Sequence, residues 1–233
     1  FAFDPAHAGR VNAYERSLRE RARLLRDRVG DDAWLSALET QMAERGVAVA
    51  VARIAMAEAL NASGAERQGL FPVATMDVSG AVEGWLTEGP ALAAEERFRE
   101  ALRAARNDDS FAGGAGIGPH RSDIIVYHRE RGTVADQLST GEQKTLLLGL
   151  VLAHARLIAA ERGAAPLLLL DEVAAHLDGK HRQALYGEIH ALGAQVWLTG
   201  TDSALFAGFE DKAQFFAVSG ATLVSADPRT SVH

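Results

Sequence analysis

The chain has 233 residues and no cysteine, which excludes a disulfide framework and any metal site built on thiolates. Its longest apolar run, residues 145–153, is too short to cross a bilayer, so we expect no membrane partner. The chain opens on Phe1, and no basic and apolar leader with a small-residue cleavage site follows it. We therefore expect a cytoplasmic protein, present here as a truncated or processed piece.

Nucleotide chemistry shows a second absence. The pattern G-x-x-x-x-G-K-[ST], whose backbone amides cradle phosphates, occurs nowhere in the chain. The Gly-Lys pair that is present, Gly179-Lys180, is followed by His181. The eight histidines show no metal-ligand spacing, and no Ser-His-Asp or Cys-His signature is found. Because the net charge is −7, any binding of nucleic acid must come from local basic patches.

Two helical patterns occupy the first quarter of the sequence. Asp4-Pro5 provides an N-cap carboxylate and a first-turn proline for one helix, and Gly30 provides its end. Asp31-Asp32 begins a second helix. Apolar residues recur at helical spacing in both segments: Val11, Tyr14, Leu18, Leu25, Val29, Leu35, Leu38, Met42, Val49, Ala52, Met56 and Ala59. These patterns predict an antiparallel helical hairpin or short coiled coil, which Gly46 weakens and Arg45 interrupts.

The remaining sequence alternates strands and helices. A strand is predicted over residues 70–78, at a sheet edge because of Pro72. Further strands are predicted over 123–128, 167–170 and 195–198, and helices over 91–106, 142–162 and 180–192. Since residues 167–170 are all leucine, that strand is expected inside a parallel sheet with both faces buried.

This order of elements predicts an α/β fold with two domains. A helical arm domain covers residues 1–108, and the second domain covers residues 109–233. The boundary is expected near residues 107–118, where the glycine-rich stretch 113–118 forms a loop.

Asp171-Glu172 directly follows the leucine strand. In an open α/β sheet, the carboxyl ends of the strands line the ligand crevice. There Asp171 can hold Mg²⁺, directly or through water, and Glu172 can deprotonate an attacking water for phosphoryl transfer. The alternative is that both carboxylates cap a following helix. For the isolated Leu-Leu-Leu-Leu-Asp-Glu segment the two interpretations are about equal.

The segment Leu138-Ser139-Thr140-Gly141-Glu142-Gln143-Lys144 opens a helix. Ser139 and Glu142 have the spacing of a capping box, which is the purely structural interpretation. The functional interpretation uses the same geometry, because free amides and a hydroxyl at a helix N-terminus bind anions, and Gly141 lets a phosphate approach the backbone. The presence of Asp171-Glu172 about thirty residues later favours the functional interpretation.

Further polar residues follow the predicted strands. Asp178 either caps the helix that begins after it or contacts a partner subunit across a nucleotide. Thr199, at the end of the strand over 195–198, either senses a γ-phosphate or is an ordinary turn residue. Arg121 and His120, in Gly118-Pro119-His120-Arg121-Ser122-Asp123, lie near a phosphate or in a plain turn. Six arginines within residues 16–28 favour a solvated helical face over contact with DNA.

The chain resembles the RecF family of bacterial recombination-repair ATPases. The resemblance depends on Gly118 to Asp123, on the segment Leu138 to Lys144, on Asp171-Glu172 with Leu177-Asp178, and on residues 195–201, and it extends to the arm over residues 14–53. It implies an ABC-type P-loop ATPase head that lacks its N-terminal lobe and carries a helical hairpin arm. The chain would then represent the C-terminal two-thirds of such a protein.

The resemblance also implies roles for individual residues. Ser139, Gly141 and Gln143 would contact the γ-phosphate end of ATP held by the opposite protomer. Asp171 would support Mg²⁺, Glu172 would be the hydrolytic base, and Asp178 would lie on the loop that crosses the dimer interface. ABC proteins often have histidine where Thr199 lies, so the identity of the phosphate sensor is open.

For the whole protein, the resemblance implies an ATP-dependent homodimer that clamps double-stranded DNA next to single-stranded gaps and acts with RecR and RecO in loading RecA. The fragment alone is expected to neither bind ATP tightly nor hydrolyse it. One alternative is the ATP-binding engine of another ABC class, such as an SMC-like protein or a transporter. Another is a non-catalytic binding module in which the ATPase lobe is vestigial, although the intact Asp171-Glu172 pair counts against it.

Overall fold

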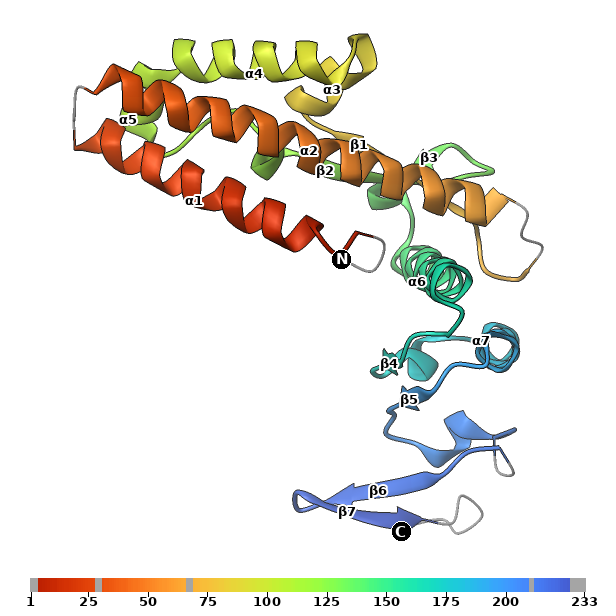
Figure 1. The fold of residues 1–233 in the computed structure, drawn as a ribbon. Helices are drawn as coiled ribbons and strands as arrows, with labels where there is room; N and C mark the ends of the chain where they lie inside the picture. Colours follow the sequence, from red (N-terminus) through yellow and green to blue (C-terminus); the bar gives the residue numbers. More distant parts are fainter. Residues whose placement is uncertain (1–3, 28–30, 66–68, 210–211, 227–233) are drawn as a thin grey trace.

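The computed structural model describes residues 4–27, 31–65, 69–209 and 212–226 (Figure 1). Its upper part is a helical layer over a small antiparallel sheet, and its lower part is a parallel strand pair with helices and a C-terminal hairpin. Helix α6 (Thr140–Arg162) lies between the two parts. Apolar side chains of α6 pack against the antiparallel sheet above and against the parallel pair below.

Helices α1 (His7–Arg26) and α2 (Asp32–Ala65) form the predicted antiparallel hairpin. Asp31 begins α2 as expected, since its carboxylate accepts a hydrogen bond from the Trp34 amide. The prediction that Asp4 caps α1 is wrong: Ala6 is the N-cap. Asp4 instead accepts from the Ala6 amide and pairs with Arg10, because a carboxylate two residues earlier reaches only the turn before the helix. The proposed end at Gly30 lies outside the described residues.

The hairpin seam carries a buried polar cluster as well as apolar side chains. Arg21, which is 1% exposed, donates to Glu39 on α2 and to Asp109 farther along the chain. Arg45 interrupts the seam as predicted, because its guanidinium donates to the Ala13 carbonyl and the Ser17 hydroxyl of α1. The seam thus combines hydrophobic packing with hydrogen bonds that fix its register.

Gly46 brings the arm helices close together instead of weakening them. A Cβ atom built there would lie 2.7 Å from the Phe98 ring and 3.1 Å from the Tyr14 ring. Phe98 belongs to α4 (Ala91–Ala104), which packs on α2 and precedes α5 (Arg106–Ala112). The single helix predicted over 91–106 is therefore divided at Ala105, and α3 (Ala81–Glu88) was not predicted.

A three-stranded antiparallel sheet lies beside α2. It contains β1 (Ala74–Ser79), β2 (Asp123–His128) and β3 (Thr133–Val134) in the order β1-β2-β3. The predicted edge position of β1 is confirmed. Its open edge is covered by Asn61 of α2, whose amide group donates to the Met76 carbonyl and accepts from the Met76 amide.

The lower part contains β4 (Leu168–Leu170) and β5 (Val196–Leu198), which pair in parallel, with α7 (Gly179–Leu192) between them in sequence. Leu168 and Leu170 are buried, but Leu169 is 72% exposed. The expectation that both faces of this strand are buried is therefore wrong for the described chain. Helices α6 and α7 cover one face. On the other face Leu169 and Trp197 are exposed, although the Phe216 ring of β6 stacks on the Trp197 ring.

The chain continues through β6 (Phe215–Ser219) and β7 (Thr222–Ala226), an antiparallel hairpin that the sequence analysis did not predict. Short 3-10 turns join the other elements: Pro119–Arg121, Ala135–Gln137, Val173–His176 and Ser203–Phe206. The domain division at residue 108 stays a prediction. Helix α5 spans that position, and β1 pairs with β2 across it.

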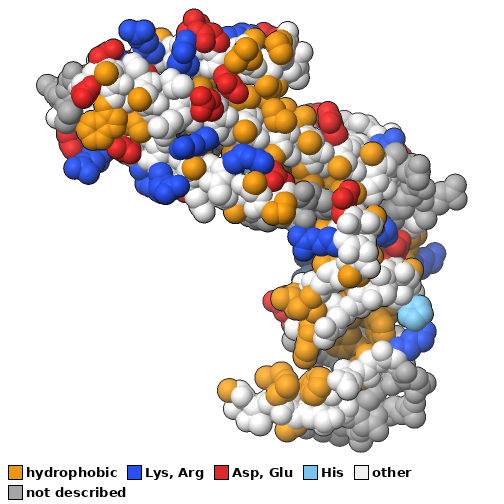
Figure 2. Space-filling model, in the orientation of Figure 1, with side chains coloured by type: hydrophobic (Ala, Val, Ile, Leu, Met, Phe, Trp, Pro, Cys, Tyr) orange, Lys and Arg blue, Asp and Glu red, His pale blue; other side chains and the backbone are white. Residues whose placement is uncertain are grey.

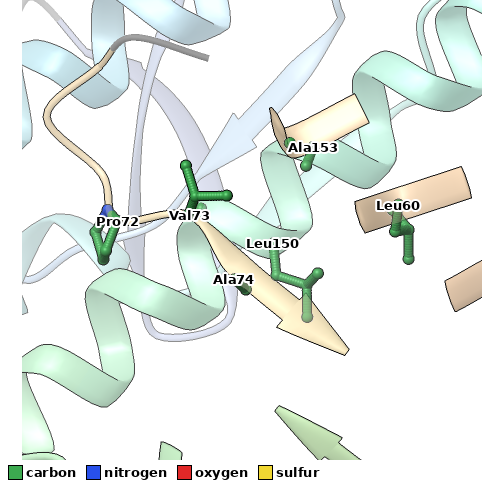
Figure 3. Close-up of a pocket in the computed structure, with 8 residues that line it drawn as sticks. Leu60, Pro72, Val73, Ala74, Leu150 and Ala153 are labelled. Atoms are coloured by element: carbon green, nitrogen blue, oxygen red, sulfur yellow. The ribbon is translucent and has the colours of Figure 1, made fainter. Parts of the chain in front are cut away.

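A small apolar cavity marks the junction of α2, β1 and α6. Leu60, Leu150 and Ala153 face it from the helices, together with residues Pro72, Val73 and Ala74 (Figure 3). Because the space is small and mainly lined by apolar side chains, it is a packing gap and not a ligand site. Helices α2 and α6 are both long and apolar enough to span a membrane by length and composition alone, a test that core helices of soluble proteins also pass.

Candidate functional site

The N-terminus of α6 carries the predicted capping box. The Ser139 amide and hydroxyl both donate to Glu142 Oε2, at 2.9 and 2.6 Å. In return, the Glu142 amide donates to the Ser139 hydroxyl oxygen at 3.4 Å. Arg131, in the turn between β2 and β3, forms an ion pair with the same carboxylate. The hydroxyl bond and Arg131 together lower the pKa of Glu142 to about 2.

Two more residues of this segment have defined surroundings. Gly141 lies in the first turn of α6, and a Cβ atom built on it would meet no atom within 4 Å. Gln143 donates its side-chain amide to the Leu138 carbonyl at 3.1 Å, which holds the turn that enters the helix. Ser139, Gly141 and Gln143 therefore lie together at one exposed helix end.

The carboxyl ends of β4 and β5 bring Asp171, Glu172 and Thr199 together. The Thr199 hydroxyl donates to Asp171 Oδ1 and accepts from the Glu172 amide at 3.0 Å. Glu172 has a left-handed backbone with φ 55° and ψ 15°, which a non-glycine residue rarely adopts. The sequence predicted the two carboxylates at a strand end, but not the hydroxyl that joins them.

Asp178 caps α7 in the structure. Its carboxylate accepts from the His181 amide and contacts the His181 ring, each at 2.9 Å. Because the bond from the His181 amide favours the charged form, the pKa of Asp178 lies below its ordinary value. Capping leaves the expected contact with a partner subunit a prediction.

No hydrogen bond or ion pair joins these three groups to one another within the described residues. The helix end at Ser139, the strand ends at Asp171 and Thr199, and the cap at Asp178 each make contacts of their own. Nor do the described residues contain a cluster of three or more metal-ligating side chains. The chain therefore presents separate parts of a site.

The turn Gly118–Ser122 is held to the arm by almost every one of its residues. His120 Nε2 donates to the Ala115 carbonyl at 2.9 Å, so Nδ1 accepts from the Tyr14 hydroxyl at 2.8 Å. Burial lowers the pKa of His120, which favours this neutral form. The Ser122 hydroxyl donates to Glu83, a carboxylate that is 2% exposed.

Arg121 and His120 are both exposed in this turn, and the Arg121 Nε donates to the Ala115 carbonyl at 3.4 Å. Next to the turn is an open hollow of about 360 Å³ that is lined by Arg53, Val78, Pro119, His120, Ser122, Asp123 and Ile124. The structure thus gives His120 a structural role and leaves a phosphate contact by Arg121 a prediction.

The arginine-rich part of α1 is mostly a solvated face, as predicted. Arg19 and Arg23 make exposed ion pairs one helical turn away, with Glu15 and Asp27. Arg21 differs because it lies seven residues after Tyr14 and four before Leu25, on the buried seam. That spacing could have identified it from the sequence.

An apolar surface continues from the strand ends. Leu169 of β4 lies opposite Trp197 of β5 in the parallel register, and the Trp197 ring stacks on the Phe216 ring of β6 at 6.2 Å between centroids. The exposed large apolar residues of this surface are Leu167, Leu169, Trp197, Phe216 and Val218. Figure 2 shows hydrophobic side chains at the surface in this lower part of the molecule.

Comparison with known proteins decides the family. The chain is 51% identical over 225 residues to the DNA replication and repair protein RecF of Brucella abortus, and 47% identical over 224 residues to that of Mesorhizobium japonicum. Each match covers 95% of the chain. The chain belongs to the RecF family. It spans 58–59% of the length of these RecF relatives. No family model matches the chain.

Solved structures agree on the fold. The chain is similar to the recombination mediator protein RecF in two structures, titled as RecF-ATPrS and RecF-ATP in the RecFOR pathway, with TM-scores of 0.75 and 0.76. Both are 20% identical to the chain and cover 96% of it, and the chain covers 59% and 60% of them. The fold predicted from the resemblance, that of a RecF protein with a helical arm, is confirmed.

Proposed function

We propose that the chain is part of an ATP-dependent DNA-binding protein of recombinational repair and replication. The observation that carries this proposal is that a chain of the RecF family holds two hydrogen-bonded polar groups, one around Ser139 and one around Asp171. Its relatives are named for DNA replication and repair, and its structural neighbours are titled as ATP-bound forms of RecF.

The separation of the two sites supports an ATP-dependent homodimer. Ser139, Gly141 and Gln143 lie at the exposed N-terminus of α6. The sequence contains no G-x-x-x-x-G-K-[ST] loop that would hold the phosphates of a nucleotide beside them. In a dimer this helix end faces the γ-phosphate of a nucleotide held by the other protomer, where free amides and the helix dipole favour an anion. Asp178, at the exposed start of α7, lies on the loop that crosses the same interface.

The strand ends supply the chemistry of hydrolysis. Asp171 offers carboxylate oxygens, which are the ligands Mg²⁺ prefers, and one carboxylate with substrate phosphates is a usual magnesium site. This donor set fits Mg²⁺ bound with ATP. Glu172, beside it, orients and deprotonates the attacking water. Thr199 lies beside both carboxylates and is hydrogen-bonded to Asp171 and to the Glu172 amide.

The exposed apolar face of β4 and β5 supports the proposal that another part of the protein packs against it. RecF relatives are longer than the chain, which spans 58–59% of them. Leu169 and Trp197 form an apolar face of the kind that a protein buries. We infer that chain belonging to the remaining length covers this face and supplies the phosphate loop.

DNA and protein partners belong to the same proposal. The dimer clamps double-stranded DNA next to single-stranded gaps and acts with RecR and RecO in loading RecA, in a cytoplasmic setting. The structural neighbours are forms of RecF in the RecFOR pathway. Because the net charge is −7, DNA contacts come from local arginines such as Arg121. A transporter or another ABC class is not favoured, since the near relatives are RecF proteins.

The test compares the full-length protein with the chain alone. We expect the full-length protein to hydrolyse ATP in the presence of gapped duplex DNA and Glu172→Gln to abolish turnover while ATP-dependent dimers persist. Glu161→Gln, at an exposed position of α6, is the matched control and should leave turnover unchanged. The chain alone should show none. ATP turnover by the chain alone that Glu172→Gln removes would overturn the claim that it cannot act by itself.

A further inference from the structure

The ends of β4 and β5 are joined by one side chain. The parallel register places Leu170 opposite Leu198, and the Thr199 amide extends the ladder by donating to the Leu170 carbonyl at 3.2 Å. Thr199 therefore lies directly beside Asp171 and Glu172. Its position is fixed by backbone pairing, before any side-chain contact is considered.

The hydroxyl of Thr199 makes a hydrogen bond with each of these two neighbours. It donates its single proton to Asp171 Oδ1 and accepts the Glu172 amide proton at 3.0 Å. A hydroxyl has one proton to donate. A phosphate oxygen accepts hydrogen bonds and needs a donor. As long as the Thr199 hydroxyl donates its proton to the hydrogen bond with Asp171, it cannot donate to a phosphate oxygen.

The second bond acts at a strained position. Glu172 has φ 55°, in the left-handed region that disfavours side chains with a Cβ atom. Such a conformation persists when its surroundings hold it. The bond from the Glu172 amide to Thr199 is one such restraint, and the backbone turn that it holds sets the direction in which the Glu172 carboxylate leaves the strand.

We propose that Thr199 is a positioning residue that fixes the Asp171 carboxylate and the Glu172 turn, and that it does not contact the γ-phosphate. The roles of Asp171 and Glu172 in hydrolysis are those of the proposed function, on which this inference rests. The hydroxyl bridge itself is a property of the folded chain. A histidine at this position would carry a ring nitrogen to the phosphate, whereas the short threonine side chain is used within the protein.

Thr199→Val removes the hydroxyl at nearly constant volume, and Thr199→Ser keeps it. In the chain itself, we expect the Glu172 amide to exchange hydrogen roughly fivefold faster in the valine variant, as for the loss of one hydrogen bond, and at the original rate in the serine variant. Thr201→Val, exposed two residues later, is the matched control and should leave this amide unchanged. Unchanged exchange in Thr199→Val would overturn the bridge, whether or not the protein hydrolyses ATP.

The second measurement uses the full-length protein. A positioning role predicts that Thr199→Val lowers kcat about tenfold or more, raises the Mg²⁺ concentration needed for half-maximal turnover, and leaves KM for ATP unchanged, with rescue by serine. A phosphate contact predicts a raised KM for ATP at saturating Mg²⁺, and that result would overturn the proposal. If the full-length protein shows no turnover, the proposed function fails, while the exchange measurement still decides the bridge.

Discussion

Arg21 Nη1 on α1 and Asp109 Oδ2 on α5 lie 2.7 Å apart, and their side chains are 1% and 4% exposed. The other two guanidinium nitrogens of Arg21 donate to Glu39 on α2 and to the Leu102 carbonyl on α4, at 2.9 and 2.6 Å. One side chain thus joins four helices of the arm. Because a buried charge is tolerated only when it is paired, this cluster makes the arm dependent on Arg21.

Replacing Arg21 by methionine should destabilise the chain by about 3–5 kcal/mol, because Glu39 and Asp109 are left buried without their cation. Arg106 also forms an ion pair with Glu39 and still neutralises its charge in the variant. Most of the lost stability therefore comes from Asp109, which loses its ion pair with Arg21. Urea unfolding followed by circular dichroism measures the change. Arg19→Met, on the exposed face of the same helix, is the control and should change stability by less than about 0.5 kcal/mol. Equal effects of the two substitutions would contradict the network.

Gly46→Ala should destabilise the arm by about 1–3 kcal/mol through overpacking. The added Cβ would lie 2.7 Å from the Phe98 ring, a distance that forces α2 and α4 apart. Gly9→Ala, in α1, adds a methyl group with no atom within 4 Å and should be neutral or slightly stabilising. The double variant Gly46→Ala with Phe98→Leu should recover part of the loss. Thermal unfolding of the wild type and these three variants tests the close approach of α4 to Gly46. A neutral effect of Gly46→Ala would exclude that close approach.

Local sequence patterns predicted the elements whose signals are local. The capping box at Ser139, the start of α2 at Asp31 and the edge position of β1 all follow from residues within a few positions of one another. Arg45 was also placed correctly, as a polar interruption of the hairpin seam. In these cases the hydrogen-bond partner lies on the same turn or on the neighbouring helix.

The misses depend on contacts between distant residues. Gly46 was interpreted as a weak point because its packing partner, Phe98, lies on a different helix. Leu169 was expected to be buried because four leucines in a row give no information on how many faces the fold covers. Thr199 was assigned a choice of two roles, since the bond to Asp171 appears only when β4 and β5 pair.

The capping box should respond to acid in a defined pH window. The folded pKa of Glu142 is about 2, below its ordinary 4.5, so its stabilising effect is complete above about pH 4.5 and is lost as the pH falls towards 2. Carbon-detected NMR titration of the Glu142 carboxyl, with the Ser139 amide as a second probe, measures it. In Arg131→Gln the pKa should rise, because one of its two main causes is removed. A wild-type titration near pH 4.5 would show that the box is not formed in solution.

Gly141→Ala separates the structural role of the α6 N-terminus from its proposed contact with a neighbour's nucleotide. A Cβ atom here meets no atom within 4 Å, so the chain alone should fold with unchanged or slightly higher stability, by up to about 1 kcal/mol. In the full-length protein the same methyl group occupies the space through which a phosphate approaches the backbone. ATP-dependent dimerisation, measured by sedimentation, should weaken about tenfold or more, equivalent to about 1.4 kcal/mol.

Gly187→Ala provides the matched control for this experiment. Gly187 is also a helical glycine whose added Cβ would meet nothing within 4 Å, but it lies on α7. It should raise stability by up to about 1 kcal/mol, as Gly141→Ala does, and leave dimerisation unchanged. If Gly141→Ala dimerised with ATP as well as Gly187→Ala does, the open space at Gly141 would not be a phosphate approach. The N-terminus of α6 would then be a capping box alone, because the Ser139–Glu142 bonds account for its structure without a ligand.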